Sequence, residues 1–107
     1  MANTPNDPTR SMSRGNVPTT CVVWKFALPI ADESWIEMPE GARILHVGVQ
    51  NEQPWIWALC TPTNRKSSRR ICVRGTGHDL GDASGEYLGT VMLADGAFVG
   101  HVFGRRN

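Results

Sequence analysis

The stretch "ARILHVGVQNEQPWIWALC", residues 42–60, decides the fold class of this chain. Its first half alternates Leu45, Val47 and Val49 with Ile44, His46 and Gly48, and its second half alternates Trp55, Trp57 and Leu59 with Ile56, Ala58 and Cys60. A period of two places successive side chains on opposite faces of a β-strand. Because the short polar stretch 51–53 separates the two runs, the pattern predicts a β-hairpin.

The same period of two continues on either side of this hairpin. In "TCVVWKFAL" it groups Val22, Trp24, Phe26 and Leu28, and it recurs in "SWIEM", "RRICVRG" and "EYLGTVMLADGAFVGHVF". In the last run Asp95-Gly96 is a strong hairpin signal. No segment shows helical spacing, so we expect an all-β chain. About seven short strands predict a small antiparallel β-sandwich or barrel.

Length and composition predict one ordinary domain. The chain has 107 residues, of which 40% are hydrophobic and 20% charged, too few for a second core. Residues 1–17 are polar and rich in Pro, so we expect a flexible arm. We expect the β domain at 18–104 and a basic C-terminal tail at 105–107. The chain shows neither a secretory signal at its start nor a membrane span, which indicates a cytoplasmic protein.

Several cysteines, histidines, glycines and basic residues have predicted structural roles. The three cysteines lack the close pairs of a zinc site, so we expect buried, reduced thiols with no metal and no cofactor. His46 and His101 lie mid-strand and are expected to be buried and hydrogen-bonded. Gly89 and Gly100 mark bulges or close approaches. We expect edge strands to be protected by Lys25, Arg69-Arg70 and Arg105-Arg106.

The segment Gly75-Thr76-Gly77-His78-Asp79 is a candidate site. Its glycines allow backbone N–H groups to converge on an anion, with His78 beside them. It is neither a dinucleotide-binding motif nor a P-loop, because no helix can follow it. His78 next to Asp79 also suggests acid–base chemistry, but no nucleophile motif accompanies the pair. The segment is therefore either a turn or a contact for a ligand or partner, and a hydrolase is the least favoured class.

A second candidate site is a run of positive charge within ten residues, made of Arg65, Lys66, Arg69, Arg70 and Arg74. The net charge of the chain is only +1, so we expect these residues to form one basic face on a dipolar surface. Such a face suits phosphate groups or an acidic protein. It can also be a solvated loop without a partner.

The tryptophans bear on the choice between these partners. Binding of single-stranded nucleic acid requires exposed aromatic side chains interleaved with cations. The four tryptophans lie away from the basic run, at alternating positions typical of a core, which disfavours nucleic acid. If Trp55 and Trp57 are exposed instead, they are good interface anchors.

The ordered motifs "VVWKFAL", "IEMPEGARILHVGVQ", "WIWAL", "RGTGHDL", "YLGTVM" and "GAFVGHVF" resemble a small domain family encoded in bacteriophages and prophages. The resemblance covers residues 22–103. It implies a protein of the bacterial host cytoplasm with no known activity, and it supplies no catalytic residues.

From this setting we expect a non-catalytic accessory binding protein. The predicted role is inhibition of a bacterial anti-phage defence system by binding a host protein complex through the basic face and the Gly-His segment. The first alternative is a signalling-nucleotide sponge or nucleic-acid-binding module that uses the same residues. The second is a virion or structural accessory protein. A homodimer formed by sheet packing is compatible with each of these.

Overall fold

The computed structural model describes residues 20–107, and the predicted N-terminal arm lies outside these residues. The described chain is all-β, as predicted. Its strands are β1 (Val22–Ala27), β2 (Glu33–Pro39), β3 (Arg43–Gln50), β4 (Gln53–Cys60), β5 (Lys66–Gly75), β6 (Glu86–Leu93) and β7 (Phe98–Gly104). One short 3-10 turn, Ala94–Gly96, joins β6 to β7. No helix in residues 20–107 has the length and apolar character needed to cross a membrane.

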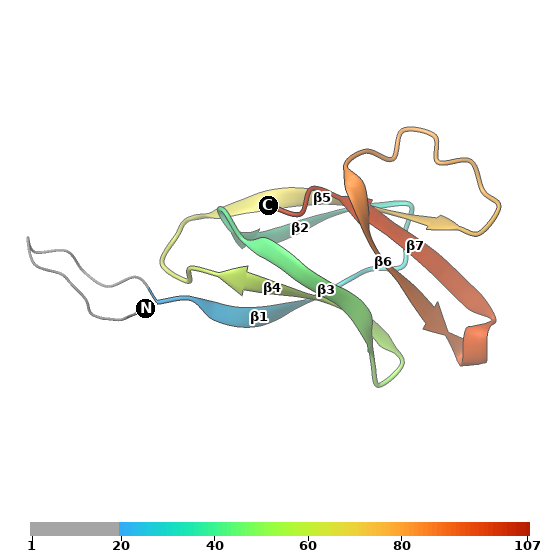
Figure 1. Ribbon diagram of the computed structural model, residues 1–107, viewed down its shortest axis with the longest axis horizontal. Helices are drawn as coiled ribbons and strands as arrows, with labels where there is room; N and C mark the ends of the chain where they lie inside the picture. The colour runs from blue at the N-terminus through green and yellow to red at the C-terminus, as the bar shows by residue number, and fades with distance from the viewer. Residues whose placement is uncertain (1–19) are drawn as a thin grey trace, which may run out of the picture.

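The strands form two antiparallel sheets. One has the order β1-β4-β3 and the other the order β2-β5-β7-β6. Figure 1 shows β3 beside β6, an edge strand of each sheet, and these two strands pack against one another. The predicted hairpins β3-β4 and β6-β7 are both present. The architecture is therefore a small antiparallel β-sandwich.

The hydrophobic core lies between the sheets. The largest fully buried aliphatic side chains are Leu28, Met38, Ile44, Ile56, Ile71, Val91 and Val102. In β4, Ile56 and Ala58 face this core with 0% exposure. Burial of each large aliphatic side chain contributes about 1.5–3 kcal/mol. Since side chains alternate along a strand, Trp55 and Trp57 point away from the core.

The face assignment predicted for β3 is wrong at its first half. The pairing of β3 with β4 shifts register between Ile44 and His46, so Leu45 lies in a β-bulge. The extra residue reverses the alternation. As a result Ile44 is buried with Val47, at 0% and 4% exposure, and Leu45 is 46% exposed.

The two glycines singled out in the last strands both mark close approaches. A Cβ at Gly89 would lie 3.0 Å from the Cβ of Val47, which lets β6 pack tightly on β3. A Cβ at Gly100 would lie 2.8 Å from Cγ1 of Val73. These positions confirm the prediction, and the pairing of β6 with β7 is also irregular between Tyr87 and Gly89.

The expected edge protection by Arg69-Arg70 is wrong. Strand β5 lies inside its sheet, between β2 and β7, so it has no open edge.

The basic C-terminal residues 105–107 are bound to the domain. The amide of Ile44 donates to the carbonyl of Arg106 at 2.8 Å, and the Arg106 guanidinium donates to the carbonyl of Ile44 at 2.9 Å. These contacts attach the end of the chain to β3.

Candidate binding surface

The predicted basic run lies mainly on β5, where the period of two separates its arginines. Arg69 shares the inner face with Ile71 and is only 3% exposed. Arg70 and Arg74 lie on the outer face. The five positive charges therefore do not form a single face. The signal was already in "RRICVRG", where Arg69 alternates in phase with two apolar residues.

Arg69 has a structural role. Its guanidinium donates to the carbonyl of Ala42 at 3.0 Å and to those of Arg105 and Arg106 at 3.2 and 3.4 Å. Burial, followed by the charge of Arg105, lowers the pKa of Arg69 below its ordinary value. Because its donors point at carbonyls within the protein, we remove Arg69 from the candidate surface.

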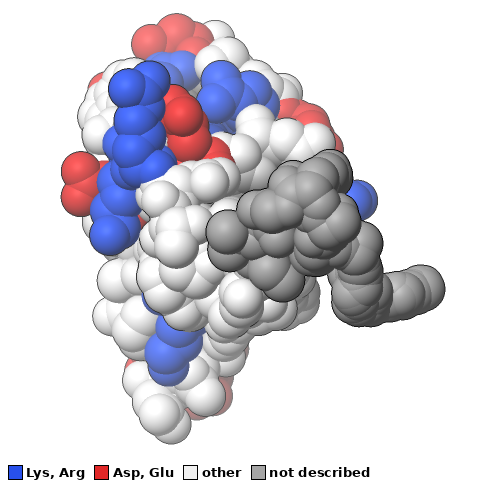
Figure 2. Space-filling view, turned by 90° about the vertical axis from the view of Figure 1, so that its left-hand side faces the viewer, with Lys and Arg blue, Asp and Glu red and all other residues white. Residues whose placement is uncertain are grey.

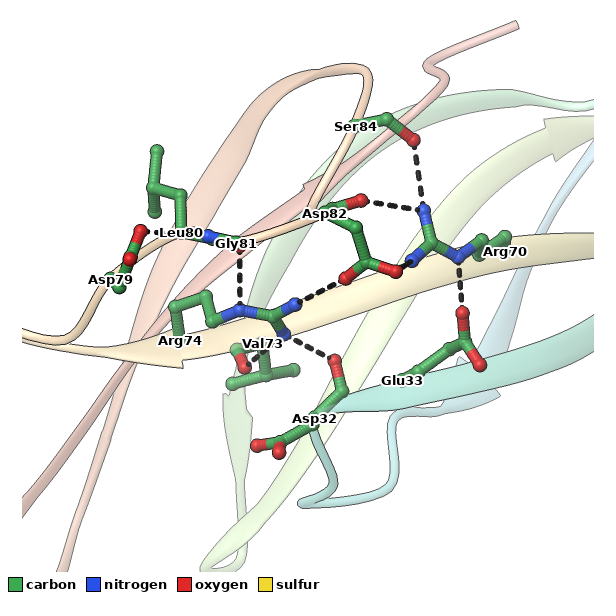
Figure 3. A network of polar contacts seen from close by, with 10 residues as sticks. All are labelled: Asp32, Glu33, Arg70, Val73, Arg74, Asp79, Leu80, Gly81, Asp82 and Ser84. Atoms are coloured by element: carbon green, nitrogen blue, oxygen red, sulfur yellow. Dashed lines mark hydrogen bonds and ion pairs between the residues drawn. The ribbon is translucent and has the colours of Figure 1, made fainter.

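Arg70 and Arg74 bind the loop that follows β5 (Figure 3). Arg70 pairs with Glu33 and with Asp82, whose carboxylate lies 3.2 Å away. The hydrogen bond that the Arg70 guanidinium donates to Glu33 is the main cause of the raised pKa of Arg70. Arg74 donates to the carbonyl of Leu80 at 3.0 Å and approaches Asp82 at 3.3 Å. Both arginines therefore fix residues 80–84 over the sheet.

The remaining basic residues of the run lie at its exposed start. Arg65 pairs with Glu40 at 3.3 Å, and Lys66 is exposed. On the side of the molecule that Figure 2 shows, blue Lys and Arg residues lie beside red Asp and Glu residues. Acidic residues remote in sequence neutralise most of the predicted basic face.

The Gly-His segment lines two adjoining hollows. One has a volume of about 310 Å³ and is lined by Gly75, Thr76, His78 and the start of β7. The other, of about 160 Å³, also includes Asp32 and the ring of Phe98. The exposed His78 ring lies over Gly75, where a Cβ would be 2.9 Å from Nδ1.

The polar groups of this segment form local contacts. The His78 amide donates to the carbonyl of Gly75 at 3.1 Å, and the Asp79 carboxylate accepts the amide of Gly81 at 3.0 Å. Asp79 therefore caps a turn, which is the geometry expected of a connection between strands. His78 and Asp79 are not arranged as a hydrogen-bonded acid–base pair.

His101 confirms half of its prediction. It is half-buried on β7, and each of its ring nitrogens meets a threonine hydroxyl, Thr76 at 2.7 Å and Thr90 at 3.0 Å. Thr90 also contacts the Tyr87 hydroxyl at 2.6 Å. The chain of contacts links the Gly-His segment to β6 and β7, so it supports a structural role for Thr76. His46, by contrast, is exposed, which contradicts the expected burial.

A hollow not predicted from the sequence lies on the outer face of the four-stranded sheet. It has a volume of about 370 Å³ and is lined by Trp35, Ser68, Arg69, Arg70, Ser84, Gly85 and Arg105. Trp35 is 62% exposed at its rim. Two of its arginines already bind protein carbonyls or carboxylates, and the Arg105 guanidinium donates to the C-terminal carbonyl at 2.6 Å. The arginine side chains that line this hollow therefore already have hydrogen-bond acceptors within the protein.

The outer face of the three-stranded sheet differs from these hollows. No other part of residues 20–107 covers its aromatic and aliphatic side chains. Strand pairing arranges them in three rows across β1, β4 and β3. The rows are Ala27–Trp55–Gly48, Lys25–Trp57–His46 and Val23–Leu59–Arg43, and we call these nine residues the tryptophan face. Val23 and Leu59 are 54% and 39% exposed. Trp55 and Trp57 are half-buried.

The Lys25 side chain reaches from its own row, beside Trp57, to Trp55 in the neighbouring row. Its ammonium lies 4.1 Å from the ring centroid of Trp55, within the range of a cation–π contact. The same ammonium donates to Oε1 of Gln50 at 2.7 Å. A positive charge is therefore held directly above an aromatic ring.

His46 has a similar arrangement with Trp57. Their ring centroids are 5.7 Å apart and the planes are inclined by 44°. Both rings reach over Gly48, where a Cβ would lie 2.8 Å from His46 Nε2 and 3.5 Å from Trp57 Cζ3. The missing side chain of Gly48 lets the two rings lie low on the sheet. The sequence prediction of Trp55 and Trp57 as core residues is wrong, since they face outward.

The buried cysteines follow their prediction and the exposed one does not. Cys60 and Cys72 are buried and unpaired, whereas Cys21 is exposed. Burial raises the pKa of the Cys60 thiol above its ordinary value. Within residues 20–107, His, Cys, Asp and Glu side chains form no group of three or more that could hold a metal ion.

The fold and this surface define a small two-sheet β domain with an aromatic, cationic sheet face. The chain belongs to the family described as "Domain of unknown function (DUF7352)", whose model matches residues 19–107. No curated protein matches the chain, and no solved structure does either.

Proposed function

We propose that the protein is a non-catalytic binding protein that docks on a macromolecular complex through the tryptophan face. The observation that carries this proposal is the outward position of Trp57 and Trp55 on the central strand β4, beside the exposed Val23 and Leu59. Tryptophan is among the side chains that contribute most to interfaces when a partner covers it.

The setting proposed for this binding is the cytoplasm of a bacterium that carries a phage or prophage, and the proposed effect is inhibition of an anti-phage defence complex. The resemblance of residues 22–103 to phage-encoded domains supports this setting. The size of the chain also suits a blocking protein, because one sheet face of a small domain can cover a site on a larger assembly.

The local hydrogen bonds of the Gly-His segment support binding over catalysis. The Asp79 carboxylate accepts the Gly81 amide, and the Arg70 and Arg74 guanidinium groups hold residues 80–84. These groups give the segment a fixed shape and leave its acid and base apart. A fixed loop next to the four-stranded sheet stabilises the domain that presents the tryptophan face.

The proposal is tested by affinity capture from bacterial lysate with tagged wild-type protein and two variants. Trp57→Ala changes the tryptophan face, and Trp35→Ala changes an exposed tryptophan on the other sheet as a matched control. We expect a stoichiometric complex that is recovered with wild type and with the control but is lost with Trp57→Ala. Equal recovery with all three proteins would contradict docking through this face.

A further inference from the structure

We infer that the tryptophan face binds single-stranded nucleic acid. This inference rests on the proposed function and names the component of the partner complex that the face contacts. The tryptophan face belongs to the other sheet from β5, which carries most of the basic run that the sequence suggested as a binding site.

The charged side chains of the tryptophan face are all basic, which gives this face a positive charge. Its nine residues include Lys25, Arg43 and His46 and contain no Asp or Glu. Within the described residues neither Lys25 nor Arg43 has a carboxylate partner; Lys25 donates to the neutral amide of Gln50. Cations that lack carboxylate neighbours favour a polyanion as the partner.

The arginines on the other surfaces behave differently. Arg65 pairs with Glu40 and Arg106 pairs with Glu86, at 3.3 and 3.0 Å. Arg70 pairs with both Glu33 and Asp82. On the tryptophan face, in contrast, the Lys25 ammonium lies against an aromatic ring and has no paired carboxylate among the described residues.

The rings are placed for stacking. Trp55 is flanked in its row by Ala27 and Gly48, which are too small to cover an indole, and the flexible Lys25 side chain lies over its ring. Trp57 lies two residues further along the same strand, so the two side chains leave the same face of β4 about 7 Å apart along the backbone. Stacking on an aromatic side chain suits any unpaired base, because every base has a π-face.

A cation and an imidazole lie next to the rings that would hold the bases. Lys25 Nζ is 4.1 Å from the Trp55 ring, and the His46 ring is 5.7 Å from that of Trp57. A nucleotide that stacks on either indole brings its phosphate within reach of these groups. Interleaved aromatic and basic side chains on an antiparallel sheet are typical of single-strand binding surfaces.

The shape of the face favours a single strand over a duplex. In a duplex the bases are stacked on one another, so the indoles of a sheet face cannot stack on them. The major groove of a duplex admits an α-helix or a two-stranded β-ribbon, whereas this face is the flat side of a three-stranded sheet. We therefore expect preference for unpaired strands, with little dependence on base sequence.

The experiment is a fluorescence anisotropy titration of a labelled single-stranded oligonucleotide of about 16 nucleotides. DNA and RNA versions and the matching duplex are compared over a range of salt concentrations. The proteins are wild type, Trp57→Ala, the double variant Lys25→Gln/Arg43→Gln, and the control Trp35→Ala. Circular dichroism of each variant confirms that it is folded.

We expect wild type and the control to bind the single strands more tightly than the duplex. Trp57→Ala should weaken binding about tenfold. Each cation removed should lower the slope of log affinity against log salt by about 0.7. Equal binding of the duplex, unchanged affinity in the folded variants, or no binding to single strands at low salt would overturn the inference.

Failure of the nucleic-acid inference can be told apart from failure of the proposed function. If Trp57→Ala abolishes capture of a complex from lysate but no oligonucleotide binds, the face recognises protein, and only the nucleic-acid inference fails. If capture is also unaffected by Trp57→Ala, docking through the tryptophan face fails as well.

Discussion

The rings of Trp57 and His46 lie with their centroids 5.7 Å apart on the outer face of the three-stranded sheet, and both extend over Gly48. Since Gly48 has no Cβ, neither ring is lifted from the sheet. The glycine is thus a determinant of the surface shape although it makes no polar side-chain contact. This relationship makes the surface testable with a single added methyl group.

Gly48→Ala is expected to weaken partner binding while leaving the fold intact. The added Cβ would meet His46 Nε2 at 2.8 Å, so the imidazole must rotate away from its place beside Trp57. The cost is small because the atom displaced is the end of an exposed side chain, and alanine in a strand removes the entropy cost of glycine. Thermal unfolding should change by a few degrees at most, and partner affinity should fall several-fold. An unchanged affinity would show that the His46 position is irrelevant to binding.

Arg69→Ala is expected to lower the free energy of unfolding by about 2–4 kcal/mol, because it leaves buried carbonyls without donors. The affected acceptors are the carbonyls of Ala42 and Arg105, whereas the Arg106 carbonyl keeps the amide of Ile44 as a donor. Urea unfolding followed by tryptophan fluorescence measures the change. Arg65→Ala is the control, since its guanidinium is exposed and its pair with Glu40 contributes at most about 1 kcal/mol. Similar losses for the two variants would contradict the structural role of Arg69.

Glu52→Gly is expected to stabilise the β3-β4 hairpin by about 0.5–1 kcal/mol. Asn51 and Glu52 both have positive φ, 55° and 61°, a conformation that favours Asn followed by Gly in a two-residue turn. The Glu52 carboxylate accepts the Ala94 amide only weakly, at 3.4 Å. Glu52→Ala removes the carboxylate and keeps the unfavourable φ, so it should not stabilise. Urea midpoints rank the three proteins, and a lower midpoint for Glu52→Gly would contradict this account of the turn.

Alkaline pH is expected to destabilise the fold through Cys60. Burial raises the pKa of this thiol in the folded state above 9.0. Well below the ordinary thiol pKa of 9.0 the group is neutral in both states, so its contribution is fully present. As the pH rises through this value the unfolded chain ionises first, and stability is lost until the folded thiol ionises too. Urea unfolding at neutral and at alkaline pH measures this loss. Cys60→Ala should be less stable at neutral pH but should show a smaller alkaline decrease; an equal decrease would exclude Cys60 as its source.

The alternation of side chains could be read from the sequence, but the direction of each face could not. A period of two separates Trp57 from Ile56 without stating which one meets the other sheet. The bulge at Leu45 also escapes sequence analysis, because it depends on the register of β3 against β4. Both features are needed to place His46 beside Trp57.

Neutralisation of the basic run could not be predicted for a similar reason. Glu33 lies 37 positions from Arg70 in the sequence, and only the pairing of β2 with β5 brings them together. The burial of Arg69, in contrast, was available from its phase with Ile71 and Val73. Local pattern therefore located the strands, whereas Arg69 was assigned to the basic face although its phase indicated burial. The binding surface required the topology.

An amide and indole NMR titration of the protein with a single-stranded oligonucleotide tests recognition by the tryptophan face. We predict shifts in the Trp55 and Trp57 indole N–H signals and in amides of β1, β3 and β4 around Lys25 and His46. Shifts confined to the Gly75–Asp79 segment or to the hollow beside Trp35, or no shifts at low salt, would contradict recognition by the tryptophan face.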